Sequence, residues 1–104
     1  MGRWVRACSL GELPPGGRKT VDCGLGELIV LFNVDGTVFA LSDTCPHQGA
    51  PLSEGQICEG TVYCPMHAWP FSLECTDKPP NDLIRHYCVR IRAGAIYLAA
   101  PETD

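Results

Sequence analysis

The sequence lacks a long apolar run, a cluster of basic residues and a signal-like N-terminus. Its longest apolar stretch, Leu28–Phe32, is far shorter than the roughly 20 residues that a membrane-spanning helix needs. Eight lysines and arginines are scattered among twelve acidic residues, for a net charge of -4, which argues against a nucleic-acid partner. The first residues hold no apolar segment of signal-peptide length. We therefore expect a cytoplasmic protein that binds neither membrane nor nucleic acid.

Helical periodicity is also absent, and short strand-like runs take its place. With 45% hydrophobic and 19% charged residues, 11 glycines and 9 prolines, the chain reads as one globular domain over residues 1–104. Asp35-Gly36 and Ala93-Gly94 each separate two strand-like runs and predict hairpin turns. The pattern predicts an all-β antiparallel sandwich or small barrel. The expected strands are Trp4–Cys8, Lys19–Cys23, Glu27–Asn33, Thr37–Leu41, Thr61–Cys64, Trp69–Leu73, Cys88–Arg92 and Ala95–Ala99.

Cysteine, by contrast, is abundant. Seven cysteines, an odd number without a secretory signal, favour thiolate ligands over a disulfide framework. Two loops rich in glycine and proline each pair one cysteine with one histidine. Cys45-Pro46-His47 begins the first and Cys64-Pro65-Met66-His67 the second, with sixteen residues between His47 and Cys64. Two thiolates and two imidazoles are the ligand set of a [2Fe-2S] centre in which histidines replace the cysteines of one iron.

With these loops the sequence resembles the Rieske family, in particular the soluble ferredoxins that serve bacterial ring-hydroxylating oxygenases. The resemblance runs from Trp4 through the last hairpin and is most specific at Gly49, Leu52, Gly55 and the Ala68-Trp69-Pro70-Phe71 segment. It implies a Rieske-type β-sandwich with two cluster-binding loops and one [2Fe-2S] cluster per chain. By the same resemblance, Cys45 and Cys64 would hold the inner iron, and His47 and His67 the outer iron, facing solvent.

The resemblance implies an electron carrier and not a catalyst. It would take electrons from a flavoprotein reductase and pass them to a terminal oxygenase. His86 is the only other histidine, so the chain has no 2-His-1-carboxylate iron site and is not the oxygenase large subunit. A second reading is the small subunit of an assimilatory nitrite reductase, a family that the chain also resembles along its length. A regulatory or docking domain of another redox complex is a third.

Two departures from the high-potential Rieske proteins concern the cluster environment. Those proteins carry a disulfide between the loops, at the positions of Ala50 and Met66, and hydroxyls near the cluster sulfurs, where this chain has Trp69 and Phe71. Fewer donors to the sulfurs stabilise the reduced cluster less. We expect a potential near the low end of the range of about -150 to +300 mV.

Several other residues carry weaker expectations. A structural zinc site is the alternative for two cysteines and two histidines, although its usual spacing differs. Trp69 and Phe71 are expected to pack around the cluster and shield it, with contact to a partner as the second possibility. Cys8, Cys23 and Cys88 are expected on strands as core or edge residues, Cys58 and Cys75 in loops as free thiols, and His86 as a surface histidine. Asp43, Glu54 and Glu59 are either solvated charges or part of a docking surface. The turn after Phe71 is expected within Asp77–Asp82.

Overall fold

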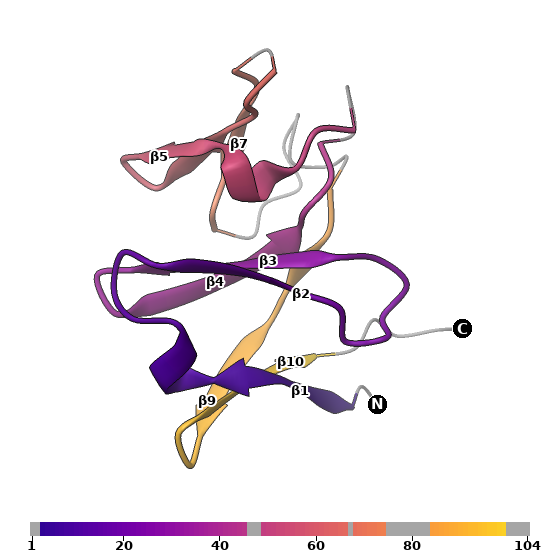
Figure 1. The fold of residues 1–104 in the computed structure, drawn as a ribbon, viewed down its shortest axis with the longest axis vertical. Coiled ribbons are helices and arrows are strands. Elements are labelled where there is room, and N and C mark those ends of the chain that lie inside the picture. The colour runs from indigo at the N-terminus through magenta and orange to yellow at the C-terminus, as the bar shows by residue number, and fades with distance from the viewer. Residues whose placement is uncertain (1–2, 46–48, 67, 75–83, 100–104) are drawn as a thin grey trace.

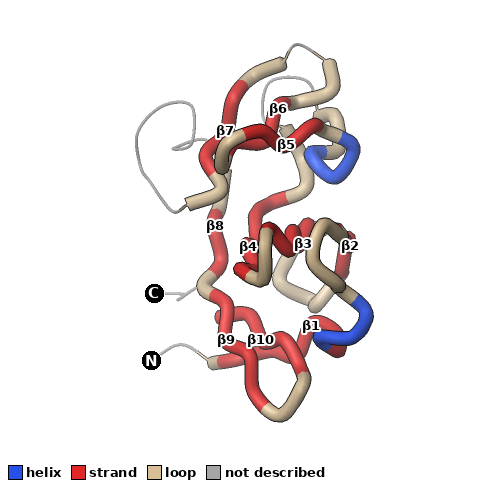
Figure 2. Tube along the Cα trace, turned by 90° about the vertical axis from the view of Figure 1, so that its left-hand side faces the viewer, coloured by secondary structure: helices blue, strands red, loops and turns tan. Residues whose placement is uncertain are grey.

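The computed structural model describes residues 3–45, 49–66, 68–74 and 84–99. Three antiparallel sheets stack as layers (Figures 1 and 2). The outer sheet has the strand order β1-β10-β9, the central sheet β2-β3-β4-β8, and the loop sheet β5-β6-β7. The strand bounds are β1 Trp4–Ser9, β2 Arg18–Val21, β3 Ile29–Val34, β4 Thr37–Ser42, β5 Gln56–Cys58, β6 Thr61–Tyr63, β7 Pro70–Ser72, β8 His86–Tyr87, β9 Val89–Arg92 and β10 Ala95–Ala99.

The expected all-β antiparallel fold is confirmed. In the described residues the helical structure is confined to two short 3-10 turns, η1 (Leu10–Glu12) and η2 (Leu52–Glu54). Each expected strand corresponds to an observed one, with ends that move by one or two residues. Strands β5 and β8 were not predicted, and β8 has only two residues, too few to show alternation. No helix among the described residues is long and apolar enough to cross a membrane.

The central sheet is buried on both faces, because β3 supplies side chains to two cores. Ile29 and Leu31 point into a lower core against the outer sheet, while Val30 and Phe32 point into an upper core against the loop sheet. All four are fully buried, as expected for a strand that reads as a continuous apolar run and not as an alternation. The upper core also holds Leu41, Cys45, Ala50, Leu52, Val62, Cys64, Phe71 and Leu73.

Hairpin turns form where the sequence predicts them. Asp35 and Gly36 have φ values of 53° and 94°, and Ala93 and Gly94 have 51° and 76°. Left-handed backbone at both central residues is the signature of the type I′ hairpin, whose twist matches that of the flanking strands. The first of these turns joins β3 to β4, which leads directly into the first cysteine-histidine loop.

A partly buried hydroxyl network holds β8 against the start of that loop. The Tyr87 hydroxyl donates to Glu27 Oε2 at 2.6 Å, and the Ser42 hydroxyl donates to the same oxygen at 2.7 Å. The Arg85 amide in turn donates to Ser42 Oγ at 3.2 Å. Burial, together with the bond to Glu27, raises the pKa of Tyr87 to about 12 from the usual 10.

The raised pKa of Tyr87 predicts a loss of stability at high pH. The unfolded chain loses the phenol proton near pH 10 and the folded chain near pH 12, so the contribution of Tyr87 is fully present below pH 10 and declines as the pH rises through 12. The free-energy difference between wild type and Tyr87→Phe, about 1 kcal/mol at neutral pH, should shrink across this window. Denaturant titrations from pH 8 to 12 measure it; a constant difference would contradict the assignment.

Candidate metal centre

The two cysteines of the predicted ligand set lie in the upper core. Cys45 follows β4 and is 1% exposed, and Cys64 follows β6 and is 3% exposed. Both belong to the same packed cluster as Phe71, which is fully buried. The fold therefore brings together two thiols that are nineteen positions apart in the sequence.

The two loops close with the same backbone pattern. In the first, the Cys45 amide donates to the Ala50 carbonyl at 2.8 Å, and the Gly49 amide donates to the Cys45 carbonyl at 2.7 Å. In the second, the Cys64 amide donates to the Trp69 carbonyl and the Ala68 amide to the Cys64 carbonyl, both at 2.9 Å. Each cysteine thus bonds to the residues four and five positions after it. The cysteines occupy equivalent points of two similar closed turns.

A left-handed residue completes each turn. Gly49 has a φ of 73°, and Ala68, at the matching position, has a φ of 57°. Glycine adopts this conformation freely, whereas alanine pays about 1 kcal/mol or more for it. The strain at Ala68 is retained because the hydrogen bonds on either side of it close the loop. Non-glycine residues in this region of backbone space often lie at functional sites.

Aromatic packing covers the base of the second loop. Trp69 is half-buried against the upper core, and its ring centroid lies 6.5 Å from that of Phe71, with the planes tilted by 38°. These two residues pack in the same core as Cys45 and Cys64, which agrees with the expected packing around the cluster, and their shielding of the cluster stays a prediction. Neither ring carries a hydroxyl that could donate to a cluster sulfur.

The two histidines of the predicted ligand set, His47 and His67, lie outside the described residues. Among the described residues, which do not include these histidines, no group of three or more His, Cys, Asp and Glu side chains comes together. The donor chemistry can still be tested against the predicted cofactor. Two buried thiols at equivalent loop positions, each with a histidine two or three residues later, match the soft ligands and imidazoles that a [2Fe-2S] cluster of this type requires. The residues of the chain therefore fit a [2Fe-2S] cluster.

The remaining described cysteines are not part of this site. Cys8 is buried in β1 and Cys23 packs half-buried against the lower core, and burial raises the pKa of both thiols. A raised pKa keeps a thiol protonated, which disfavours metal binding. Cys23 lies beyond the end of β2, and Cys88 is exposed between β8 and β9, so neither is on a strand as expected.

Two expectations for loop residues can be compared with the structure, and two fall outside it. Cys58 is an exposed free thiol as expected, but it ends β5 instead of lying in a loop. His86 lies on β8, half-buried, with Nε2 3.1 Å from the Ser72 carbonyl oxygen, so it is not a plain surface histidine. Cys75 and the predicted turn at Asp77–Asp82 lie outside the described residues.

Asp43 differs most from its expected role. Instead of a solvated or docking charge, it is 5% exposed, and its carboxylate accepts the Ser53 amide at 2.7 Å and the Ser53 hydroxyl at 3.3 Å. Its backbone carbonyl accepts the Leu52 amide at 2.6 Å. Asp43 therefore holds η2, the turn that ends the first loop. Glu54 and Glu59 are exposed, as either expectation requires.

Comparisons with known proteins agree over most of the chain. A profile of the Rieske [2Fe-2S] domain matches residues 3–87. The chain is 36% identical, over 96% of each protein, to the 3-phenylpropionate/cinnamic acid dioxygenase ferredoxin subunit of Escherichia coli K12.

Solved structures give the same result. A chain from the complex of reduced oxygenase and oxidized ferredoxin in carbazole 1,9a-dioxygenase matches with a TM-score of 0.80 and 26% identity, over 96% of this chain and 95% of that one. A nitrite reductase small subunit from Mycobacterium tuberculosis matches with a TM-score of 0.82 and 27% identity, over 99% of both chains. The protein therefore belongs to the Rieske [2Fe-2S] domain family, as an electron-transfer ferredoxin and not as an enzyme that transforms a substrate.

Proposed function

We propose that this protein is a soluble carrier that takes single electrons from a flavin-dependent reductase and delivers them to the terminal oxygenase of a ring-hydroxylating dioxygenase. The observation that carries the proposal is the pair of buried cysteines, Cys45 and Cys64, at equivalent points of two loops that close in the same way. The likeness to a dioxygenase ferredoxin subunit over 96% of the chain supports the choice of system.

Within this proposal, Cys45, His47, Cys64 and His67 hold one [2Fe-2S] cluster per chain, and residues 1–104 form one Rieske domain. When bound, such a cluster supplies a centre that accepts and releases one electron at a time. The role of the chain is to hold the thiolates in the dry upper core and to present the histidine side of the loops to a partner. Loops closed by paired hydrogen bonds change shape little, which favours rapid electron transfer.

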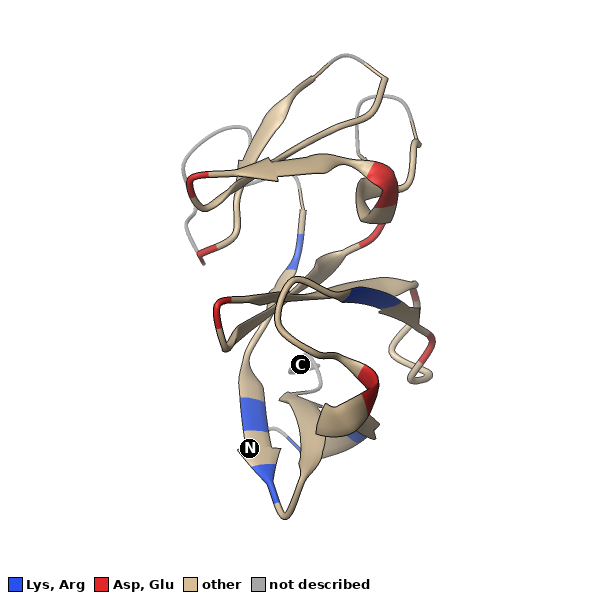
Figure 3. Ribbon diagram, turned by 60° about the vertical axis from the view of Figure 1, so that its left-hand side comes forward, with Lys and Arg blue, Asp and Glu red and all other residues tan. Residues whose placement is uncertain are grey.

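Charge supports a particular kind of partner surface. Between Asp43 and Glu74 the sequence contains no lysine or arginine. Glu54, in η2, and Glu59, next to β5, are exposed. Figure 3 shows acidic but no basic positions at the loop-sheet end, while acidic positions also occur on the other two layers. An acidic end attracts a basic partner surface and orients the encounter. We infer that the redox partners present lysines and arginines to this end. Cys58 and Cys88 are free thiols, and free thiols favour a reducing compartment. A cytoplasmic location therefore stays a prediction.

A nitrite reductase small subunit is the second candidate, because one such subunit shares the fold over 99% of this chain. Electron-transfer assays separate the two. The purified protein, reduced by NADH through a flavoprotein reductase, is added to a ring-hydroxylating terminal oxygenase or to a sirohaem nitrite reductase large subunit. The proposal predicts product formation by the oxygenase that depends on the protein. Dependence of nitrite reduction alone would favour the second candidate.

The reduction potential is a further prediction. Phe71 is fully buried in the same core as both cysteines, and neither it nor Trp69 offers a hydroxyl to a cluster sulfur. Without such donors the added negative charge is stabilised less. Film voltammetry should give a midpoint near about -150 mV, the low end of the Rieske range. A midpoint above about +100 mV on that scale would show that other groups donate to the sulfurs.

A further inference from the structure

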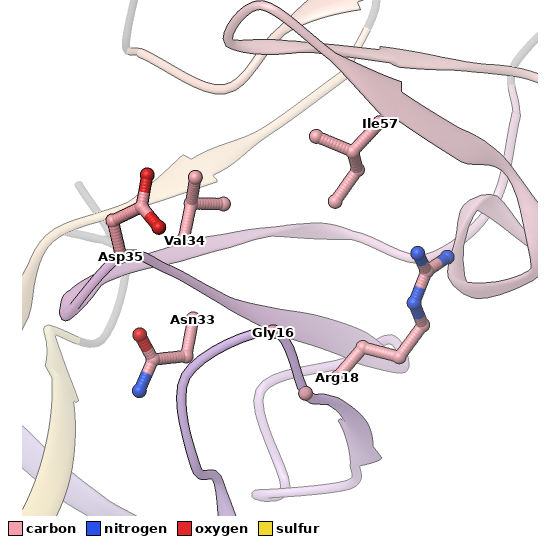
Figure 4. Close-up of a pocket in the computed structure, with 7 residues that line it drawn as sticks. Gly16, Arg18, Asn33, Val34, Asp35 and Ile57 are labelled. Carbon is pink, nitrogen blue, oxygen red and sulfur yellow. The ribbon is translucent and has the colours of Figure 1, made fainter.

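Arg18 connects the central sheet to the segment between the two loops. From β2, its Nη1 atom donates to the Ser53 carbonyl at 2.9 Å and to the Gly55 carbonyl at 2.5 Å, 35 and 37 residues further along the chain. Its guanidinium carbon lies 5.2 Å from the centroid of the Phe32 ring, which positions the side chain over the upper core. Figure 4 shows Arg18 extending away from Asp35 along one side of a cavity of about 170 Å³ that Ile57 also lines.

The same turn is held from its other side by Asp43. The Ser53 amide and hydroxyl donate to the Asp43 carboxylate, while the Ser53 carbonyl accepts from Arg18. Ser53, in η2, thus has its amide bound to the buried Asp43 carboxylate and its carbonyl bound to the Arg18 guanidinium. Hydrogen bonds to charged groups are about twice as strong as neutral ones, so this arrangement fixes η2 more firmly than backbone pairing alone.

The contact continues to the second cysteine through Gly55. A Cβ atom at Gly55 would lie 2.2 Å from the Tyr63 carbonyl oxygen, so the Gly55 backbone presses directly against the residue before Cys64. Arg18 binds the carbonyl of this same glycine. A shift of Gly55 would therefore move the start of the second loop, and a shift of Ser53 would move the end of the first.

We propose that Arg18 is a positioning residue that sets the placement of the two ligand loops relative to each other. The proposal rests on the proposed function, because the loops matter as ligand loops of the cluster. The effect of Arg18 on the placement of the loops concerns the protein alone. Lysine cannot replace this arrangement fully, because an ammonium stacks less well than a guanidinium on the Phe32 ring. Arg18 itself is exposed, but both of its hydrogen bonds go to backbone carbonyls, so it links β2 to the segment between the two loops.

Arg18→Gln, Arg18→Lys and the control Arg90→Gln test this role. Arg90 also lies over an aromatic ring, 4.3 Å from the Trp4 centroid, but on the outer sheet. Arg18→Gln should speed iron loss to a chelator by at least about tenfold, because tenfold is the factor for one lost charge-assisted hydrogen bond and Arg18 makes two. It should also change the g-values of the reduced cluster. Arg18→Lys should give an intermediate rate, and Arg90→Gln the wild-type rate and spectrum.

A second measurement does not need the cluster. In metal-free protein, amide exchange at Ser53 and Cys64 should be faster in Arg18→Gln than in Arg90→Gln. Equal exchange in the two variants, or an unchanged spectrum and iron-loss rate in Arg18→Gln, would overturn the positioning role. A wild-type protein that takes up no iron would refute the proposed function instead, while the exchange result would still decide the role of Arg18.

Discussion

Replacing Cys64 with serine is expected to abolish the iron-sulfur chromophore while leaving a folded chain. A serine hydroxyl is a hard, weakly acidic group that cannot substitute for a soft thiolate. Loss of a residue that only supports a ligand already lowers metal affinity by about 10- to 100-fold, so loss of a ligand should reduce it by at least about 100-fold. Iron content and the visible spectrum of anaerobically purified protein measure the effect.

The chain offers a control of equal burial. Cys8 and Cys64 are both 3% exposed, but Cys8 lies in the lower core. Cys8→Ser introduces the same buried hydroxyl and should lower the melting temperature without loss of colour. Cys88→Ser, at an exposed thiol, should change neither. A coloured Cys64→Ser protein with wild-type iron, or a colourless Cys8→Ser protein that remains folded, would contradict the assignment of ligands.

Gly55→Ala is expected to be the most damaging single-methyl change in the described chain. The new Cβ would lie 2.2 Å from the Tyr63 carbonyl oxygen and 3.2 Å from that of Leu52. Backbone atoms cannot rotate away as a side chain does, so β5 and β6 must separate. We expect a loss of about 3 kcal/mol or more, at the upper end for overpacking, which lowers the melting temperature by roughly 12 °C or more.

Gly11→Ala is the matched control for this prediction. Nothing lies within 4 Å of a Cβ at Gly11, and its backbone is not left-handed. The same methyl group there should stabilise the chain by about 0.5 kcal/mol, by restricting the unfolded state. Thermal melts of both variants in metal-free protein make the comparison independent of the cluster. Similar melting temperatures for the two variants would show that the contact between Gly55 and Tyr63 is not rigid.

The parts of the fold that depend on neighbouring residues could be predicted from the sequence. Asp35-Gly36 and Ala93-Gly94 form turns that depend on these residues alone, so the turns and the strands on either side of them could be predicted. Glu59-Gly60 forms a turn of the same kind, with φ values of 50° and 76°. It was not predicted, because β5, the strand before it, was not recognised in the sequence. Strand β8 depends on pairing with β4, across more than forty residues, and leaves no local pattern.

The ligand residues of the candidate site could be predicted from the sequence, but the contacts that support the two loops could not. The spacing of cysteines and histidines identifies the donors because ligands must be particular atoms. Asp43 has no such constraint in the sequence. Its carboxylate accepts a hydrogen bond from the Ser53 amide, ten residues later, and this contact forms only when the loop folds. Arg18 likewise has no distinguishing pattern in the sequence. Its role depends on the fold, which places the carbonyls of Ser53 and Gly55 next to its guanidinium.

Metal and sulfide analysis of anaerobically purified protein, combined with an electron paramagnetic resonance spectrum after reduction, tests the central claim most directly. The account predicts equal iron and acid-labile sulfide, about two of each per chain, and a rhombic low-g signal that changes when His47 is replaced. Zinc without sulfide, no bound metal, or a signal unaltered in the His47 variant would contradict it.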